Sequence, residues 1–380
     1  MATVKLMDVI TRAHSKVDKD NTDLIYYVGG EHFETENPVV EDRGLIAGST
    51  IGPMFYYGFM AGQFLLVSRN PHLRKAGVAH FDGICSEKTF VLESKNPEIL
   101  LPDFLPFILQ NERFWKYAID HKHGSTNFFL NWGDLSQYTF DLPSLNEQKR
   151  IANALWALVN TQKSYKKLLK KTDNLVKSQF IEMFGDLSRS AKYPTVELGS
   201  ISEMISGGTP SSKYPEYFGG KIPFVTTPCL GANYIDAKDA QNWLTELGVE
   251  NSSTHMVPAY SLMIGNRVGV GKSSINTCEM CTNQDILSFV GVDTEKYDLL
   301  FLKKVIEQYV PFFESQKRGA TIKGIPSDLV KASKIPQAPM DIQRQFVDFV
   351  RQSDKSKFEL EQSLAELTAT YKRIISENLG

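Results

Sequence analysis

The sequence predicts an α+β protein with a pseudo-twofold internal repeat, in which two mixed α/β domains are joined by two long helices that form an antiparallel coiled coil. Three observations support this fold class. A segment of the chain returns 195 positions later, so that Gln148 corresponds to Gln343. Each copy ends in a long stretch without glycine or proline, from Ser144 to Phe184 and from Met340 to Leu379. Both stretches place apolar residues at a spacing of about 3.5 residues, which is typical of paired helices.

The repeat defines the predicted domains. The segment from Leu142 to Leu155 returns from Gln337 to Val350, and Gly124-Ser-Thr returns as Gly319-Ala-Thr. Two large copies indicate a tandem duplication rather than a solenoid, which needs several short repeats. The predicted parts are an α/β domain at residues 1–143, a long helix at 144–185, a second α/β domain at 190–335 and a second long helix at 336–380.

Within the α/β domains, short apolar runs between glycine, proline and asparagine residues predict β-strands. These runs are Ile25–Val28, Phe64–Val67, Ile222–Val225 and Ile286–Val290. Single helices are predicted at matching places in the two copies, Leu105–Ala118 and Leu299–Phe313.

Composition excludes several classes of protein. The chain has 380 residues, of which 42% are hydrophobic and 23% charged, as expected for two globular domains. Four cysteines are too few for a disulfide scaffold and suit a reducing compartment. No cationic start followed by an apolar stretch is visible at the N-terminus, so we expect a cytoplasmic protein without a secretory signal.

One segment tests for a membrane span. No charged residue occurs between Arg43 and Arg69, which is long enough to cross a bilayer. Glycine and proline interrupt this segment repeatedly, and a bilayer contains no water to satisfy a broken backbone. The segment therefore predicts buried strands and turns, and we expect no membrane partner.

The long helices are predicted to pair along an apolar seam. Ser144 and Asp341 are the expected helix caps. Polar Gln162 and Lys357 occupy equivalent seam positions, where they can fix the register. The alternative is two separate helices, each packed on its own domain. The apolar seam residues are Ile151, Leu155, Leu158, Tyr165, Leu169, Val176, Phe346, Val350, Leu360, Leu364, Leu367 and Tyr371.

With these features the chain resembles the specificity subunit of Type I restriction–modification systems. The similar residues are the helix openings Pro143–Gln148 and Pro339–Gln343, the close Phe184-Gly185, and three motifs of the second copy, Gly207–Pro210, Gly219–Val225 and Arg267–Gly271. The first copy has Ser68–Val78 in place of the last motif. Ile342 stands where the family usually has glutamate, and Leu379 where it has phenylalanine.

The resemblance implies a non-catalytic subunit with two target-recognition domains. Each domain would bind one half of a bipartite, asymmetric sequence in double-stranded DNA, and the helices would set the spacer between the halves. The helices would also bind two DNA-adenine methyltransferase subunits, which restriction–translocase subunits can join. This chain would hold no cofactor, because S-adenosylmethionine, ATP and Mg²⁺ would bind to the partner subunits.

Enzyme alternatives rest on weaker patterns. Gly269-Val-Gly-Lys272-Ser273 resembles the end of a P-loop of an NTPase, but Asn266 occupies the position of the first glycine. Asp103, Glu147 and Lys149 resemble a metal-dependent nuclease, although helix capping also explains Glu147. Cys278 and Cys281 form a single pair without further zinc ligands. A coiled-coil scaffold that does not bind DNA is a further alternative.

Arginine, lysine, asparagine and hydroxyl side chains in loops are the candidates for DNA contact. The net charge of only −2 predicts that the isolated chain binds DNA weakly. Residues 144–185 are basic, and their lysine run is either a solvated helix face or a surface for phosphates or a partner. The candidates in the first copy are Arg69, Arg74, Lys75, Lys122, Ser125, Thr126 and Asn127. Those in the second copy are Arg267, Lys272, Ser273, Lys317, Arg318, Thr321 and Lys323.

Overall fold

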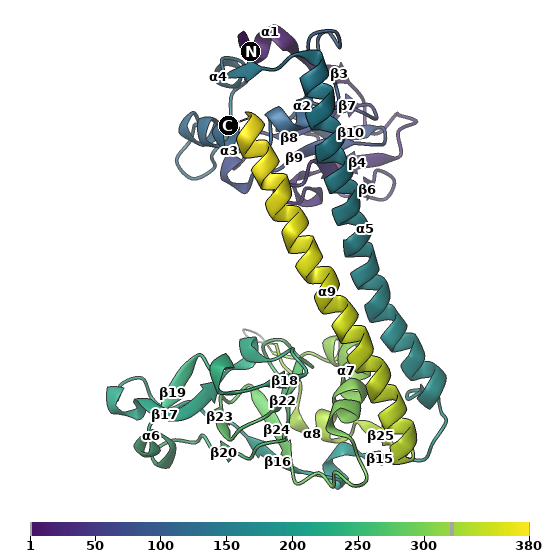
Figure 1. The fold of residues 1–380 in the computed structure, drawn as a ribbon, viewed down its shortest axis with the longest axis vertical. Helices are drawn as coiled ribbons and strands as arrows, with labels where there is room; N and C mark the ends of the chain where they lie inside the picture. The colour runs from purple at the N-terminus through teal and green to yellow at the C-terminus, as the bar shows by residue number, and fades with distance from the viewer. Residues whose placement is uncertain (1, 320–322, 380) are drawn as a thin grey trace. The chain divides into compact units, whose positions relative to one another are not determined.

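The computed structural model describes residues 2–319 and 323–379. It divides into two compact units (Figure 1). Unit 1 comprises Met1–Leu168 with Leu360–Gly380, and unit 2 comprises Leu169–Glu359. Each long helix therefore contributes one part to each unit. The sequence-predicted boundaries of the α/β domains, which assign the helices separately, stay predictions.

Unit 1 contains two five-stranded sheets and a two-stranded sheet. The strand orders are β2-β11-β8-β9-β5, β3-β7-β10-β4-β6 and β1-β12. The strands are β1 (Ala2–Lys5), β2 (Ile10–Ala13), β3 (Ser15–Lys16), β4 (Tyr26–Val28), β5 (Val39–Val40), β6 (Gly44–Leu45), β7 (Phe55–Phe59), β8 (Phe64–Val67), β9 (Ala76–Ala79), β10 (Gly83–Ser86), β11 (Thr89–Ser94) and β12 (Thr139–Leu142). The short helices are α1 (Leu6–Val9), α2 (Leu105–Ile108), α3 (Glu112–Asp120) and α4 (Trp132–Leu135).

Unit 2 contains sheets in the orders β16-β24-β21-β22-β18, β19-β17-β23-β20, β15-β25 and β13-β14. The strands are β13 (Gly185–Asp186), β14 (Ser190–Ala191), β15 (Thr195–Glu197), β16 (Glu203–Ser206), β17 (Phe218–Val225), β18 (Tyr234–Ile235), β19 (Asn242–Leu244), β20 (Met256–Val257), β21 (Leu262–Gly265), β22 (Ser273–Asn276), β23 (Met280–Thr282), β24 (Ile286–Val290) and β25 (Lys334–Pro336). The helices are α6 (Glu246–Glu250), α7 (Leu299–Ser315) and α8 (Ser327–Lys331).

The two units repeat the same topology. The sheet β2-β11-β8-β9-β5 of unit 1 corresponds strand for strand to β16-β24-β21-β22-β18 of unit 2. The register also agrees, because Phe64 lies opposite Val78 and Leu262 lies opposite Ile275. The last strand joins each sheet in parallel, β5 on β9 and β18 on β22. The internal repeat and the α+β class predicted from the sequence are confirmed.

One predicted helix is interrupted. The sequence predicts a single helix over Leu105–Ala118, whereas the structure has α2 ending at Ile108 and α3 beginning at Glu112. Asn111 causes the break, because its side chain caps α3 by accepting a hydrogen bond from the Phe114 N–H at 2.7 Å. The corresponding helix of unit 2, α7, is continuous over Leu299–Ser315.

The long helices are α5 (Leu145–Phe184) and α9 (Met340–Leu379), each of 40 residues. Ser144 precedes α5 and accepts a hydrogen bond from the Glu147 N–H at 3.4 Å. Asp341 is not the cap of α9, which begins one residue before it, so the aspartate lies within the first turn. There its negative charge is favourable for the helix dipole. Gly185 ends α5 at φ +82°, a conformation that favours glycine.

A buried glutamine joins each long helix to its domain. Gln148 donates hydrogen bonds to the carbonyls of Ile99 and Pro143, both at 2.9 Å, and accepts one from the Leu101 N–H. Gln343 makes the same three bonds with Lys296, Ala338 and Asp298. Both glutamines are fully buried, so only a side chain with a donor and an acceptor satisfies these backbone groups.

The long helices pack on each other in an antiparallel manner within each unit. In unit 1 the Gln162 amide donates to the Thr368 hydroxyl at 3.2 Å. In unit 2 the Lys357 ammonium lies 2.6 Å from the Asp173 carboxylate. The polar seam residues Gln162 and Lys357 thus make contacts between the two helices, as expected for residues that fix the register of a coiled coil. All twelve apolar seam residues are buried or half-buried.

Both units have large aromatic cores. In unit 1 the core contains Trp115, Phe104 and Phe107 together with Ile151 and Leu155 of α5. In unit 2 a cluster of four fully buried phenylalanines joins α5, α7 and α9. These are Phe180, Phe184, Phe301 and Phe346. Among the described residues, no helix is long and apolar enough to cross a membrane.

Candidate nucleic-acid interface

Each unit carries an exposed hairpin at the same place in its fold. In unit 1 the backbone of His123 pairs with that of Phe129, with N–H to carbonyl distances of 2.8 and 3.0 Å. In unit 2 Arg318 pairs with Gly324 in the same way, both at 2.9 Å. The two pairs are related by the offset of 195 that the repeat predicts. Hairpin 1 is defined here as residues 123–129, and hairpin 2 as the described residues 318–319 and 323–324 at the corresponding place.

Glycine opens both hairpins for a conformational reason. Gly124 has φ +90° and Gly319 has φ +128°, values that L side chains rarely adopt. A Cβ at Gly124 would also lie only 2.6 Å from the carbonyl oxygen of Asn127. The glycine matched between the copies in the sequence is therefore required by the turn.

One arginine stands beside each hairpin. The Leu130 N–H, just after hairpin 1, donates to the carbonyl of Ser68 at 2.9 Å, and Arg69 pairs with Phe129. In unit 2 the Ile325 N–H donates to the carbonyl of Asn266 at 2.8 Å. Arg69 and Arg267 are therefore equivalent residues. Both are exposed, so the fold brings a guanidinium to the base of each hairpin.

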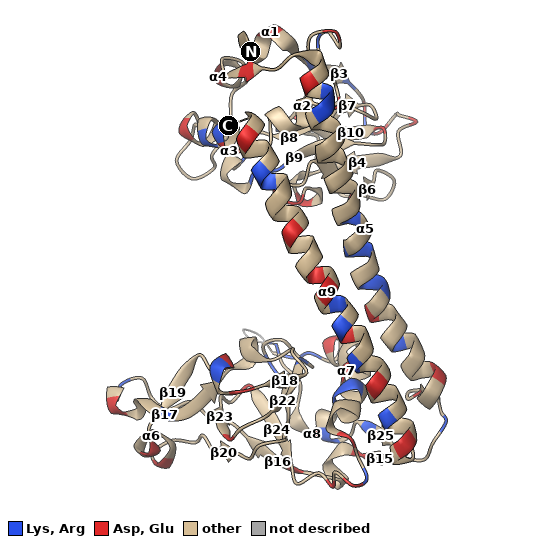
Figure 2. Cartoon of the chain, in the orientation of Figure 1, with Lys and Arg blue, Asp and Glu red and all other residues tan. Residues whose placement is uncertain are grey.

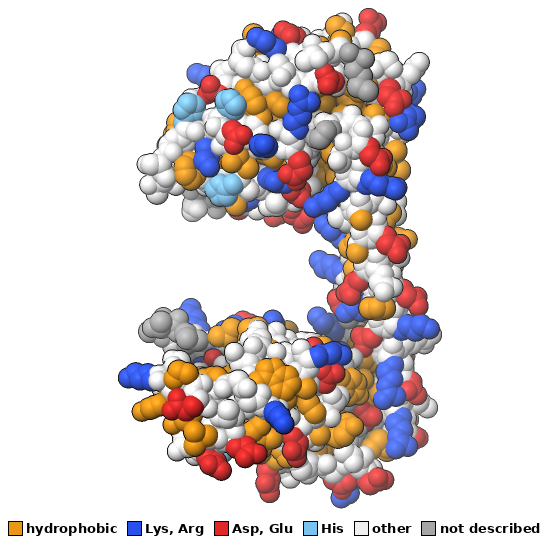
Figure 3. All heavy atoms as spheres, turned by 60° about the vertical axis from the view of Figure 1, so that its left-hand side comes forward, with side chains coloured by type: hydrophobic (Ala, Val, Ile, Leu, Met, Phe, Trp, Pro, Cys, Tyr) orange, Lys and Arg blue, Asp and Glu red, His pale blue; other side chains and the backbone are white. Residues whose placement is uncertain are grey.

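Aromatic side chains support hairpin 1. The Lys122 ammonium lies 4.6 Å from the ring centre of Phe128, and His72 contacts the same ring edge-on at 6.4 Å. The Asn70 N–H donates to the Phe128 carbonyl at 2.9 Å. Ser125, Thr126 and Asn127 at the tip of hairpin 1 are exposed. Histidines and basic residues gather on one face of unit 1 (Figure 3).

A carboxylate lies beside the arginine of unit 2. Asp285 is 3.5 Å from Arg267, and only 12% of its side chain is exposed. In unit 1 the corresponding position is held by Lys88, whose ammonium lies 2.7 Å from the carboxylate of Glu87. This contact lowers the pKa of Glu87, and the Tyr56 hydroxyl and the charge of Arg69 lower it further. Sequence reasoning missed Asp285, because its approach to Arg267 depends on the pairing of β21 with β24.

Several predicted DNA-binding residues already have partners within the protein. Arg74 lies 2.5 Å from both Glu36 and Glu112. The Lys75 ammonium donates to the Gly30 carbonyl at 2.6 Å, and Lys317 pairs with Glu314 at 2.5 Å. A DNA contact by any of these three residues would compete with its internal partner.

The remaining candidates of unit 2 differ in exposure. Lys272, Arg318 and Lys323 are exposed, in agreement with a surface role. Ser273 is only 2% exposed, because it lies in β22, where all four residues are buried. A direct contact of Ser273 with DNA would therefore require its exposure, and it stays a prediction. Thr321 lies outside the described residues.

The structure does not favour the enzyme patterns. Lys272 is followed by the strand β22, whereas a P-loop leads into a helix. Glu147 pairs with Arg150 at 2.6 Å on the first turn of α5, as expected for a helix end. Over residues 2–319 and 323–379, no group of three or more His, Cys, Asp and Glu side chains is arranged to hold a metal ion.

The lysine run of α5 is partly neutralised by its own unit. Lys163 lies 3.0 Å from Glu41, and Lys166 lies 3.4 Å from Glu34. These pairs are exposed and contribute little to stability. Further basic residues follow along α5 beyond them (Figure 2). The alternatives of a solvated face and a binding surface for the rest of the run remain predictions.

The model of the Type I restriction modification DNA specificity domain matches residues 14–172 and 191–369 of this chain. The chain belongs to this family. The family's domain occurs twice, once in each copy of the internal repeat, and the two matches together cover most of the sequence.

Curated relatives of this specificity-domain protein are specificity subunits of Type I restriction enzymes. The MjaIX subunit of Methanocaldococcus jannaschii is 26% identical over 182 residues, 45% of this chain and 41% of the relative. The EcoR124I/EcoR124II subunit of Escherichia coli is 25% identical over 189 residues, 48% of this chain and 46% of the relative. The matched regions thus span less than half the length of these two relatives.

Solved structures show the same fold. The S subunit of a Type I restriction-modification system from M. genitalium has a TM-score of 0.56 at 14% identity, covering 100% of this chain and 96% of that chain. A chain from a study of assembly and conformational transition of the Type I R-M system has a TM-score of 0.60 at 18% identity, covering 99% and 96%. At this identity the likeness concerns the fold alone.

Proposed function

We propose that this chain is the DNA sequence-specificity subunit of a Type I restriction–modification complex. In this function each unit binds one half of a bipartite DNA target, and the paired helices serve as spacer and docking element. The observation that carries the proposal is the duplicated site. Two equivalent hairpins, each with an exposed arginine at its base, provide two similar surfaces for two half-sites. Family membership supports the same function.

The partners and cofactors follow from this proposal. Two DNA-adenine methyltransferase subunits would bind the helices, and restriction–translocase subunits could join them. S-adenosylmethionine, ATP and Mg²⁺ would bind to those subunits, and this chain would contribute specificity without a catalytic step. The positions of Glu147 and Lys272 support a subunit that contributes specificity alone. Glu147 pairs with Arg150 on the first turn of α5, and Lys272 precedes a strand rather than the helix that follows a P-loop.

The test is a long-read methylome of cells with and without this gene. The proposal predicts N6-methyladenine at a split motif of two short blocks around a fixed gap, and loss of this methylation when the gene is deleted. Exchange of residues 1–143 for those of another specificity subunit should change one block only. If a methyltransferase that co-purifies with the chain methylates the same sites without it, the proposal is wrong and the scaffold alternative is favoured.

A further inference from the structure

The two units share one exposed cation in an equivalent setting, although most residues around it differ. Arg69 and Arg267 both follow the third strand of the matching sheet, β8 or β21. Hairpin 1 presents Ser125, Thr126 and Asn127 at its tip, whereas hairpin 2 is bounded by Arg318 and Gly324. The arginine is therefore the part of the surface that the two copies have in common.

The carboxylate beside Arg267 indicates what this arginine binds, and its equivalent Arg69 is expected to bind the same kind of group. A phosphate contact gains energy from net positive charge, because it releases counterions from DNA. Asp285, at 3.5 Å, offsets much of the charge of Arg267 and would repel a phosphate. Binding to the edge of a guanine base depends on the orientation of the guanidinium rather than on net charge. The O6 and N7 atoms of the guanine accept two parallel hydrogen bonds from a guanidinium that is held in one orientation.

Hairpin 2 also makes room for this orientation. A Cβ at Gly324 would lie 2.7 Å from Cγ of Arg267 and 2.8 Å from the carbonyl oxygen of Asn266. Glycine thus allows the aliphatic part of Arg267 to lie against the hairpin backbone. Packing below and a carboxylate beside the guanidinium restrict the side chain before DNA binds, which reduces the entropy lost on binding.

Arg69 has the same position but no ion pair with another described residue. The nearby Glu87 instead contacts Lys88 at 2.7 Å and the Tyr56 hydroxyl at 3.1 Å. Within the described residues the Arg69 guanidinium has no hydrogen-bond partner and is free to bind an external acceptor. Both arginines are therefore available, with Arg267 the more restricted of the two.

We propose that Arg69 and Arg267 each bind the major-groove edge of one guanine, one in each half of the DNA target, with Asp285 as the positioning residue of Arg267. This inference rests on the proposed function and deepens it. It requires that both half-sites contain a G·C pair at corresponding positions. In unit 1 the exposed Ser125, Thr126 and Asn127 of hairpin 1 then contact further bases of that half-site.

The experiment uses the chain assembled with its methyltransferase and a duplex that carries the motif from the methylome. Initial methylation rates are measured on this duplex and on duplexes with one base pair changed at each position. Arg267→Ala should slow methylation of the cognate duplex on the order of 10- to 100-fold and abolish discrimination at one G·C pair of one half-site. Arg69→Ala should do the same in the other half-site. Discrimination at all other positions should persist.

Matched variants separate base contact from charge and from folding. Arg267→Lys retains the charge but loses the fork, so it should lose discrimination at the same G·C pair as the alanine variant. Asp285→Asn should weaken discrimination at that pair while affinity for unrelated DNA is retained. The exposed Arg113 of unit 1 and Arg189 of unit 2 are control positions, and their alanine variants should behave as wild type. Thermal unfolding confirms that each variant folds.

The outcomes distinguish failure of the guanine inference from failure of the proposed function. Uniformly slower methylation with unchanged discrimination, or full activity of Arg267→Lys, would show a phosphate contact and overturn the guanine inference alone. A wild-type complex that methylates all duplexes equally would instead overturn the proposed function.

Discussion

Units 1 and 2 share the topology of their matching five-stranded sheet. They differ in how they stabilise the loops that lead into two strands of this sheet. At the start of the long helices they agree, because Gln148 and Gln343 make the same three hydrogen bonds to backbone groups. They differ in the loops that lead to the outer strands, β5 and β9 in unit 1 and β18 and β22 in unit 2. There the backbone adopts left-handed conformations at two equivalent positions.

In unit 1 both left-handed positions hold charged residues. Glu36 has φ +59° and Arg74 has φ +49°, which is unfavourable for residues with a Cβ. Their side chains pair with each other, and Arg74 also contacts Glu112 of α3. Lys372 of α9 lies 3.5 Å from Glu36 and extends this group of charges to the long helix. Ion pairs therefore accompany the backbone strain.

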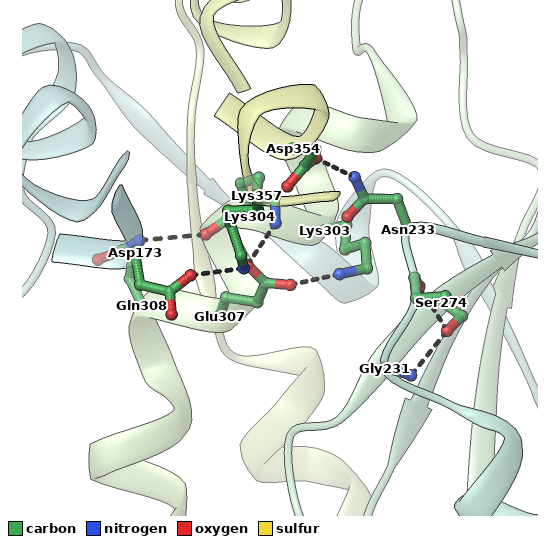
Figure 4. A network of polar contacts seen from close by, with 11 residues as sticks. Asp173, Gly231, Asn233, Ser274, Lys303, Lys304, Glu307, Gln308, Asp354 and Lys357 are labelled. Carbon is green, nitrogen blue, oxygen red and sulfur yellow. Dashed lines mark hydrogen bonds and ion pairs between the residues drawn. The ribbon is translucent and has the colours of Figure 1, made fainter. Parts of the chain in front are cut away.

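In unit 2 the same positions are Gly231, with φ +134°, and Gly271, with φ +78°. The ion pairs lie elsewhere (Figure 4). Glu307 of α7 pairs with the buried Lys303 and with Lys304, and Asp354 of α9 accepts a hydrogen bond from the Asn233 amide at 2.6 Å. Burial is the main cause that lowers the pKa of Lys303.

This difference shows which features the fold imposes. The sheet requires the left-handed turns and the satisfied backbone groups, and both units provide them. The fold does not specify which residues occupy these left-handed positions. Unit 1 has an ion pair of two strained residues there and unit 2 has two glycines, so the copies have diverged at these positions. In the helix openings the copies share one glutamine, Gln148 or Gln343, which satisfies three backbone groups.

The largest difference between the two units in the effect of a substitution on stability is expected at the C-terminal ends of the long helices. Phe184 of α5 is fully buried against Phe301 and Phe346, whereas its equivalent in α9, Leu379, is half-buried. Phe184→Ala should destabilise unit 2 by about 3–5 kcal/mol, because it leaves a cavity in the aromatic cluster. Leu379→Ala should destabilise unit 1 by less than about 2 kcal/mol. Denaturant unfolding with hydrogen exchange assigns each loss to its unit, and equal losses would contradict the comparison.

The glutamines should give equal effects in the two units. Gln148→Ala and Gln343→Ala each leave one N–H and two carbonyls without their partner, at a cost of about 2–3 kcal/mol. Urea unfolding of both variants measures this cost. Gln148→Glu and Gln343→Glu serve as matched controls of similar size that lose the donor, and they should be at least as unstable. A marked inequality between the two sites would show that the junctions are not equivalent.

At the left-handed positions, glycine should give a more stable protein than alanine, because only alanine has a Cβ that is strained there. Glu36→Ala removes the ion pairs and keeps the strain, so it should be less stable than Glu36→Gly by about 1 kcal/mol. Gly231→Ala should destabilise unit 2 by about 1–2 kcal/mol from backbone strain alone, since a Cβ there meets no atom within 4 Å. Thermal unfolding of the three variants is the measurement. Identical stability of Glu36→Ala and Glu36→Gly would mean that no strain is relieved at residue 36.

The smallest effect concerns acid stability. The hydrogen bond from Arg74 lowers the pKa of Glu112 below its usual value of 4.5. The folded state therefore binds its proton less readily than the unfolded state. The contribution of Glu112 is present above pH 4.5 and is lost as the pH falls through the lowered pKa. Glu112→Gln should flatten the stability profile of unit 1 slightly below pH 4.5, and an unchanged profile would contradict this assignment.

Much of the fold follows from local patterns in the sequence. The runs Phe64–Val67 and Ile286–Val290 are strands β8 and β24 with the predicted bounds. The helix predicted over Leu299–Phe313 is α7, only two residues longer. The interruption before α3 was not predictable from hydrophobic spacing, because it depends on one capping bond of Asn111. Asp341 shows the same limit, since the cap of a helix is set by local backbone geometry.

The site was predictable only in part. The basic and hydroxyl residues of hairpin 1 and the matching glycine of hairpin 2 are visible in the sequence. The internal partners of Arg74 and Lys75 are not, because Glu36, Glu112 and Gly30 come from elements far along the chain. The burial of Ser273 could be inferred only after β22 was known to lie inside a sheet.

The sequence by itself determined the duplication, the two long helices and the family, since these depend on periodicity and on motifs that repeat at a nearly constant offset. Only the tertiary structure decided that Arg69 and Arg267 are equivalent, that each lies at the base of a hairpin and that Asp285 stands beside Arg267. The physical reason is that these contacts form across strands whose offset between the copies shifts with each insertion or deletion in a loop. Hydrogen bonding between strands restores the equivalence that the linear spacing has lost.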